Sequence, residues 1–155
     1  FEHFDVRPDV VTLAKALGNG MPIGACWARA EVAAAFVPGD HGTTYGGQPL
    51  ATAAARATLA VMEAEDVPAR AAAAGARLAA GLGRLPGVVA VRGLGLLLAA
   101  ELAGADARRV TDDALDRGLV VNAVTPSAIR LAPPLLVSDA EIDEALAILG
   151  EVLAA

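Results

Sequence analysis

One lysine stands out among the residues that could do chemistry. The chain has eleven arginines but a single lysine, Lys15, which follows the apolar run DVVTLA and precedes the glycine-rich segment GNGMPIG. Apolar neighbours at a strand end would reduce the contact of an ammonium group with water and favour the neutral amine. A neutral amine can form a Schiff base with an aldehyde, whereas a guanidinium stays protonated. Lys15 is therefore predicted to be a nucleophile, with a chance lysine that snorkels at the strand end as the alternative.

Two adjacent hydroxyl groups, those of Thr43 and Thr44, lie in the segment HGTTYGG just before an expected helix. Glycines and exposed backbone amides ahead of a helix N-terminus favour an anion the size of phosphate. The alternative is an ordinary loop in which Thr44 caps the helix. His41 has no Ser, Cys or acidic partner in a recognisable pattern, so we interpret it as structural.

Arg130 is a cation in an apolar run, between Ile129 and Leu131. A guanidinium there needs a carboxylate partner, and its planar fork can donate two hydrogen bonds to one carboxylate. That partner is either a ligand or an internal acid such as Glu101, and both remain open. An amine, a phosphate-sized anion site and a carboxylate clamp together suit an enzyme that binds pyridoxal phosphate and an amino acid.

Composition narrows the possible partners. A hydrophobic content of 55% over 155 residues excludes a disordered chain. The net charge of −6 argues against nucleic acid or an anionic membrane as partner, which leaves small molecules and protein surfaces. The longest charge-free stretch, residues 42–55, is too short to span a membrane. The single cysteine, Cys26, allows neither an internal disulfide nor a metal knuckle, so we expect a cytoplasmic protein without a metal site.

The start of the chain resembles the middle of a protein. It begins at Phe1 with FEHFDVRPD, without an initiating Met and without the pattern of a signal peptide. We therefore expect the chain to be a piece of something longer.

The elements that must position these residues alternate between strands and helices, which predicts an α/β class. Before a boundary expected near residues 66–68, we predict strands at 9–14 and 25–28, a short helix in RAEVAAAF, and a helix over 48–65 that Pro68 separates from the next. After the boundary we predict a compact βαβ-like unit. Its expected elements are helices at 69–85 and 106–117, two strands in 88–102 hinged at Gly93 and Gly95, strands at 119–124 and 128–136, and a last helix that begins with Ser138 and Glu141 as a capping box.

Four segments in order carry a resemblance to a known family: PDVVTLAKALGNGMPIGA, GDHGTTYGGQPLA, VRGLGLLLAAEL and GLVVNAVTPSAIRLAPPL. They resemble the class III pyridoxal-phosphate-dependent aminotransferases, most closely the acetylornithine aminotransferases, over nearly the whole chain. The resemblance implies the α/β fold of fold type I transferases. Residues 1–66 would be the C-terminal remainder of the large cofactor-binding domain, and residues 67–155 the small C-terminal domain.

The resemblance also implies roles for the residues above. Lys15 would hold pyridoxal 5'-phosphate covalently and then shuttle a proton between the substrate carbon and the cofactor. Thr44 would bind the cofactor phosphate in the neighbouring subunit. Thr43 stands where the family usually has Ser and would contact the substrate. Arg130 would bind a substrate carboxylate. A homodimer with shared active sites follows.

The implied reaction moves the terminal amino group of N2-acetyl-L-ornithine to 2-oxoglutarate, a step of arginine biosynthesis. Ornithine, succinylornithine and 4-aminobutyrate aminotransferases are the alternatives within the family. An alternative of another class is a non-catalytic remnant that acts only by association.

Some departures from the family pattern bear on activity. Asn19 replaces a common glycine and Gln48 replaces the usual Asn, and both changes are mild. The family's glycine-rich phosphate loop, stacking aromatic and pyridinium-pairing acid would lie before Phe1, so we expect the 155 residues alone to be inactive. We also expect exposed apolar surface around residues 10–13 and on the helix that begins at Leu50.

Overall fold

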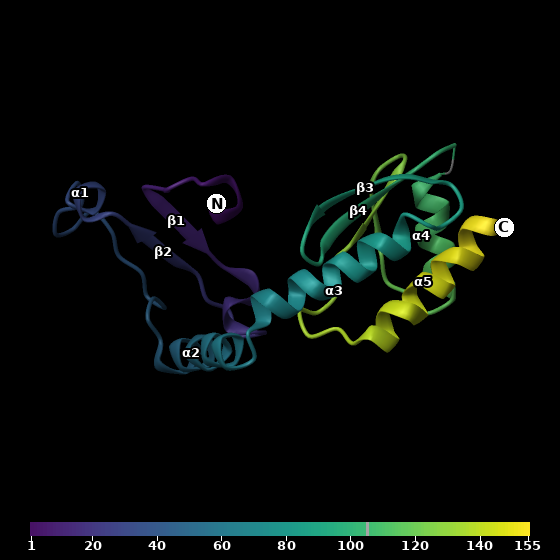
Figure 1. Ribbon diagram of the computed structural model, residues 1–155. Coiled ribbons are helices and arrows are strands. Elements are labelled where there is room, and N and C mark those ends of the chain that lie inside the picture. Colours follow the sequence, from purple (N-terminus) through teal and green to yellow (C-terminus); the bar gives the residue numbers. More distant parts are fainter. Residues whose placement is uncertain (105) are drawn as a thin grey trace. The chain divides into compact units, whose positions relative to one another are not determined.

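The computed structural model describes residues 1–104 and 106–155 and has a mixed α/β architecture (Figure 1). It divides into two compact units, Phe1–Glu65 and Asp66–Ala155. No helix among the described residues is long and apolar enough to cross a membrane. The described residues also bring together no group of three or more His, Cys, Asp or Glu side chains that could hold a metal ion.

The first unit consists of a two-stranded sheet and short helical segments. Its elements are η1 (Glu2–Phe4), β1 (Val10–Leu13), η2 (Lys15–Gly18), β2 (Ala25–Ala28), α1 (Ala30–Ala33) and α2 (Pro49–Ala64). The strands pair antiparallel, with Val11 opposite Trp27, and α2 packs against the 3-10 turn η2. The helix expected in RAEVAAAF is only one turn long. None of its residues is buried, and so short a helix gains too little from its own hydrogen bonds to extend.

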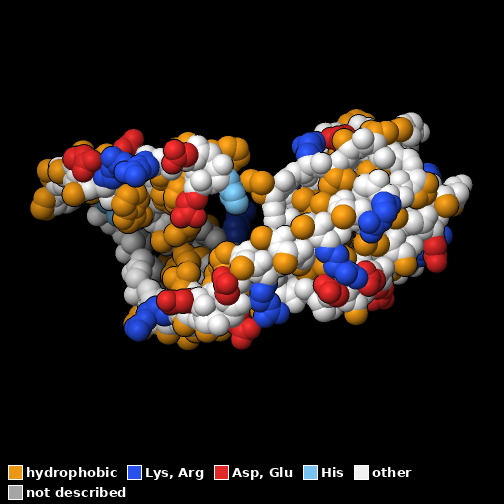
Figure 2. All heavy atoms as spheres, in the orientation of Figure 1, with side chains coloured by type: hydrophobic (Ala, Val, Ile, Leu, Met, Phe, Trp, Pro, Cys, Tyr) orange, Lys and Arg blue, Asp and Glu red, His pale blue; other side chains and the backbone are white. Residues whose placement is uncertain are grey.

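Hydrophobic side chains of the first unit are largely exposed. Among its described residues only Ala51 and Ala55 are buried hydrophobics, whereas Val10 is 47% exposed, Leu13 50% and Leu50 67%. Figure 2 shows hydrophobic side chains at the surface of the molecule. A sheet of two four-residue strands with one long helix has no second layer to cover them. The expectation of exposed apolar surface on this strand and this helix is confirmed.

The second unit is a four-stranded antiparallel sheet with helices on one face. Its elements are α3 (Val67–Leu82), β3 (Val88–Leu94), β4 (Leu97–Leu102), α4 (Ala107–Asp116), β5 (Asn122–Thr125), β6 (Ala128–Leu131) and α5 (Asp139–Ala154). The strand order is β3-β4-β6-β5. The predicted βαβ-like unit needs correction: β4 and β5, which α4 connects, are not neighbours, because β6 lies between them and pairs antiparallel with both. This is a split βαβ arrangement.

The core of the second unit lies between the sheet and its helices. The largest fully buried side chains come from all three helices and from β6: Leu78, Leu82, Val110, Ile129, Ile142, Leu149 and Val152. In β4, Leu98 and Ala100 belong to this core, but Ala99 does not. Because side chains alternate along a strand, Ala99 and the residues level with it lie on the opposite face of the sheet.

Several predicted boundaries are shifted. Two helices are present here as expected, but the break lies at Glu65 and Asp66. Because α3 begins at Val67, Pro68 occupies its first turn, where its missing N–H does no harm. The hairpin turns at Gly95, whereas Gly93 lies within β3 with φ of 135°. The capping box is confirmed, because the Glu141 N–H donates to Ser138 Oγ and the Glu141 carboxylate accepts from the Ser138 N–H at 2.7 Å.

Candidate functional site

Lys15 lies where β1 turns into η2. Ala14 is still extended, and the next residue, Lys15, has φ of 60°, in the left-handed region. The described non-glycine residues with positive φ are Asp5, Lys15, Asn19 and Asp66, so the other three carry the short polar side chains that tolerate this conformation. For lysine it costs about 1 kcal/mol or more, and such strain concentrates at functional sites. Of these four residues, Lys15 is the one with a long side chain in the left-handed region, and its role as a nucleophile stays a prediction.

The turn after Lys15 is held by close packing. Gly18 is buried, and a Cβ there would lie 2.8 Å from Ile23 Cγ2, so the position has no room for a larger residue without movement. Asn19 ends the turn with φ of 44°, and its N–H donates to the Ala16 carbonyl at 3.0 Å. Asparagine tolerates the left-handed region better than most residues.

The expected shielding of the Lys15 ammonium group is not present. The residue is exposed, and among the described residues no hydrogen bond or ion pair engages its Nζ atom. The physical reason is the same lack of a second layer that leaves Leu13 exposed. Within these residues Lys15 is therefore an accessible amine, and the desolvation expected from its apolar neighbours is absent.

Thr43 and Thr44 lie in an exposed loop that leads into α2. The Thr43 methyl group lies over Gly46, where a Cβ would clash with it, and Gly47 turns the chain with φ of 71°. Thr44 is not the helix cap, because the N-cap residue is Gln48 and its side chain makes no capping hydrogen bond. The Thr44 hydroxyl is therefore available to a ligand, and the N-terminal amides of α2 have no side-chain cap.

Arg130 lies on β6, on the sheet face opposite the helices. Its Nε–H donates to Asn122 Oδ1 at 3.1 Å, and these two residues are direct cross-strand partners. The internal pair with Glu101 that the sequence left open does not form. Glu101 instead accepts hydrogen bonds from Arg92, with Nη2 2.6 Å from Oε1. Arg130 thus keeps its charge available for a ligand.

The predicted site residues fall into two groups. Lys15 and the threonine loop belong to the first unit, where α2, the helix that follows the loop, packs against the turn that starts with Lys15. Arg130 belongs to the second unit.

Sequence reasoning missed Arg92 and Asn122. The available signal for Arg92 was the one that marked Arg130, a single charged residue in an otherwise apolar strand, whereas nothing in the short strand NAVT marked Asn122.

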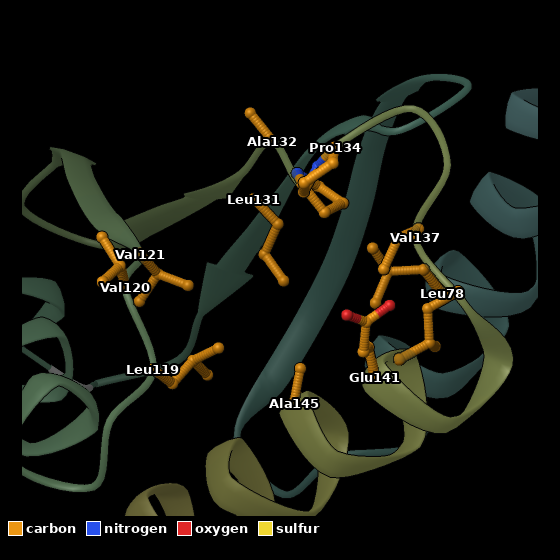
Figure 3. Close-up of a pocket in the computed structure, with 12 residues that line it drawn as sticks. Leu78, Leu119, Val120, Val121, Leu131, Ala132, Pro134, Val137, Glu141 and Ala145 are labelled. Carbon is orange, nitrogen blue, oxygen red and sulfur yellow. The ribbon is translucent and has the colours of Figure 1, made fainter.

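Two cavities in the described part of the chain are lined by other residues. A cavity of about 390 Å³ in the second unit lies between β6, its extension to Val137, and α5, and the Glu141 side chain points toward it (Figure 3). One of the two carboxylate oxygens of Glu141 is engaged by the helix cap. A shallower hollow of about 730 Å³ in the first unit is lined by the N-terminal segment and the sheet, including Trp27. Neither hollow is lined by Lys15, Thr43, Thr44 or Arg130.

The sequence matches the class-III aminotransferase family over residues 1–153. Among curated relatives, the acetylornithine aminotransferase of Gloeobacter violaceus is 49% identical, over 99% of this chain and 40% of the relative. That of Corynebacterium efficiens is 46% identical, over 99% of this chain and 38% of the relative. The chain thus spans about 40% of the length of these curated relatives.

Solved structures agree with this match. The acetylornithine aminotransferase of Elizabethkingia anophelis aligns with a TM-score of 0.88 at 31% identity, over 99% of this chain and 42% of that one. The ornithine aminotransferase of Toxoplasma gondii, described with pyridoxal phosphate partly occupying its active site, aligns with a TM-score of 0.89 at 33% identity, over 99% and 38%.

Proposed function

This chain belongs to the class-III aminotransferase family, and on that premise we propose that the protein transfers the terminal amino group of N2-acetyl-L-ornithine to 2-oxoglutarate. The products are N-acetyl-L-glutamate 5-semialdehyde and L-glutamate. The observation that carries the choice of substrate is the identity of 43% to 49% to curated acetylornithine aminotransferases along almost the whole chain. We place the enzyme in the cytoplasm, in arginine biosynthesis.

The proposed organisation follows the family. Residues 1–66 form the C-terminal remainder of the large cofactor-binding domain, and residues 67–155 form the small C-terminal domain. The active enzyme is a homodimer whose two subunits share each active site. In support, the chain separates into compact units at Glu65 and Asp66.

The residues present fit pyridoxal 5'-phosphate. The exposed Lys15 amine matches its aldehyde, and the exposed Thr44 hydroxyl, uninvolved in capping α2, matches its phosphate. When bound, the cofactor supplies an electron sink for the negative charge that develops at the substrate carbon.

The chain's own residues then have distinct roles. Lys15 Nζ would hold the cofactor and would carry the proton between the substrate carbon and the cofactor. The Thr44 hydroxyl binds the phosphate in the neighbouring subunit, and the Thr43 hydroxyl contacts the substrate. The Arg130 guanidinium binds a substrate carboxylate, for which its lack of an acidic partner among the described residues leaves it free.

Borohydride reduction of the full-length protein with pyridoxal phosphate, followed by peptide mass analysis, tests the cofactor assignment. Reduction fixes the cofactor to the amine that holds it, so the label is expected on Lys15, the single lysine of residues 1–155. Lys15→Arg keeps the charge but not the nucleophile and should take no label. Label elsewhere, or none, would refute the assignment and favour a non-catalytic protein.

Assays of the same protein with four amino donors test the substrate. We expect a higher kcat/KM with N-acetylornithine than with ornithine, succinylornithine or 4-aminobutyrate. A preference for free ornithine would replace the proposed donor without affecting the role of Lys15.

A further inference from the structure

Two arginines lie in one row across the outer face of the sheet of the second unit. The register places Arg92 opposite Ala99, Ala99 opposite Arg130, and Arg130 opposite Asn122. Cross-strand partners share a face and their Cβ atoms lie about 5 Å apart. The small Ala99 side chain therefore separates the two guanidinium-bearing positions.

The two arginines differ in how their charge is compensated. Arg92 pairs with the carboxylate of Glu101 at 2.6 Å. Arg130 hydrogen-bonds to the neutral amide of Asn122 at 3.1 Å, and no described carboxylate lies within 4 Å of its guanidinium nitrogens. A neutral acceptor can orient a guanidinium without pairing its charge, so the Arg130 charge has no acidic partner among the described residues.

The atom that Asn122 engages matters for recognition. A guanidinium can meet a carboxylate side-on, through Nε and one Nη, or end-on, through both Nη atoms. The Nε–H of Arg130 is directed to Asn122 Oδ1, so the side-on edge is occupied. The edge formed by Nη1 and Nη2 remains open to a ligand.

We propose that Asn122 is a positioning residue that presents the Nη1 and Nη2 edge of Arg130 to the carboxylate of the amino acid or oxo acid substrate. This inference rests on the proposed function, in which Arg130 binds that carboxylate. Arginine has four rotatable side-chain bonds, and the Asn122 hydrogen bond restricts them before the substrate arrives, which lowers the entropic cost of binding.

The test measures carboxylate recognition in the full-length protein loaded with pyridoxal phosphate. Asn122→Leu keeps a similar shape and removes the acceptor, while Asn122→Asp keeps an acceptor but adds a charge that competes with the substrate. Val124→Leu, on the same strand, is the matched control. Calorimetry with glutarate, an unreactive dicarboxylate, reports binding without turnover, and steady-state kinetics report KM and kcat for 2-oxoglutarate.

Asn122→Leu is expected to weaken glutarate binding and raise the KM for 2-oxoglutarate about fivefold, the effect of one lost hydrogen bond, with little change in kcat. Asn122→Asp should weaken both further, and Val124→Leu should change neither. N-acetylputrescine, which is N-acetylornithine without its carboxylate, should react equally well with the wild type and Asn122→Leu. An equal loss of activity with N-acetylornithine and N-acetylputrescine in Asn122→Leu would overturn the role of Asn122. No change in glutarate binding would overturn it as well.

Arg130→Ala separates this inference from the function on which it rests. If Arg130→Ala loses glutarate binding while Asn122→Leu binds like the wild type, only the positioning role fails. If Arg130→Ala itself binds glutarate normally, the proposed carboxylate site is wrong, and the inference fails with it. Should Asn122→Leu not fold, Asn122→Ala is measured in its place against the same expectations.

Discussion

Gly75 in α3 lies directly against the backbone of Gly95, in the turn that joins β3 and β4. A Cβ atom on Gly75 would overlap the Gly95 carbonyl group, which belongs to the main chain and has no alternative rotamer. The absence of a side chain on Gly75 thus lets the helix approach the hairpin that carries Arg92 and Glu101.

Gly75→Ala is therefore expected to destabilise the protein, although Ala is the better helix former by about 1 kcal/mol. Overpacking against a backbone group costs about 1–3 kcal/mol, so we expect a net loss of about 1–2 kcal/mol. Urea unfolding of the full-length protein measures it. Gly150→Ala is the matched control, because its Cβ would make an ordinary contact at 3.6 Å with Leu85, and it should stabilise by about 0.5–1 kcal/mol. Equal stability of the two variants would contradict the close contact.

The left-handed backbone of Lys15 allows a comparison of two inactive variants. Lys15→Gly and Lys15→Ala both lack the amine and should lose transamination alike. Glycine adopts φ of 60° without a steric cost, whereas alanine keeps the strain, so Lys15→Gly should be more stable by about 1 kcal/mol. Thermal unfolding of the two cofactor-free proteins gives the difference. A more stable Lys15→Ala would show that the residue does not hold this conformation.

The two units should differ in cooperative folding when they are produced separately. The buried hydrophobic cluster lies entirely in the unit Asp66–Ala155, whereas the described buried hydrophobics of Phe1–Glu65 are Ala51 and Ala55. We expect residues 66–155 alone to unfold cooperatively in urea and residues 1–65 alone to show no cooperative transition. Circular dichroism at 222 nm follows both, and a gradual transition for residues 66–155 would contradict a self-sufficient core.

The capping box of α5 makes stability depend on pH. The pKa of Glu141 is lowered, first by the hydrogen bond from the Ser138 N–H and then by that from its hydroxyl. A carboxyl group with a lower pKa in the folded state stabilises the protein above its unfolded pKa, about 4.3, and this contribution is lost as the pH falls through the folded pKa. The wild type should therefore exceed Glu141→Gln in melting temperature at pH 7, and the gap should narrow as the pH falls below about 4.3, the unfolded pKa.

Glu144→Gln serves as the control for that experiment, because Glu144 is exposed on the same helix and takes no part in the cap. Its melting temperature relative to the wild type should not follow the pH dependence of Glu141→Gln. A gap between the wild type and Glu141→Gln that stays constant from pH 7 to pH 3 would rule out an ionised cap.

The strand register of the sheet in the second unit could not be predicted from the sequence. Arg130 could be recognised as an unusual cation, but its partner could not be chosen between Glu101 and a ligand. The ladder places Arg92, nine residues before Glu101, within reach of that carboxylate and sets Asn122 beside Arg130. A shift by one residue would have turned these side chains to the other face, and which strands pair is decided by segments that are distant along the chain.

The exposure of Lys15 has a similar origin. The sequence predicted its place after an apolar strand and before a glycine-rich turn, and in the structure Lys15 is the first residue of η2, just after β1. Shielding by apolar neighbours was expected from the same residues, yet burial depends on a layer that packs over the strand, and the described residues of the first unit supply none.

The sequence by itself determined the nucleophile candidate, most strands and helices, the capping box at Ser138 and the family, because these are carried by residue type and short spacing. Only the tertiary structure decided the strain at Lys15, the split order of the sheet, the pairing of Glu101 with Arg92, and the hydrogen bond from Arg130 to Asn122. Those features arise from contacts between segments distant along the chain, where packing and register choose among arrangements that local preferences leave equal.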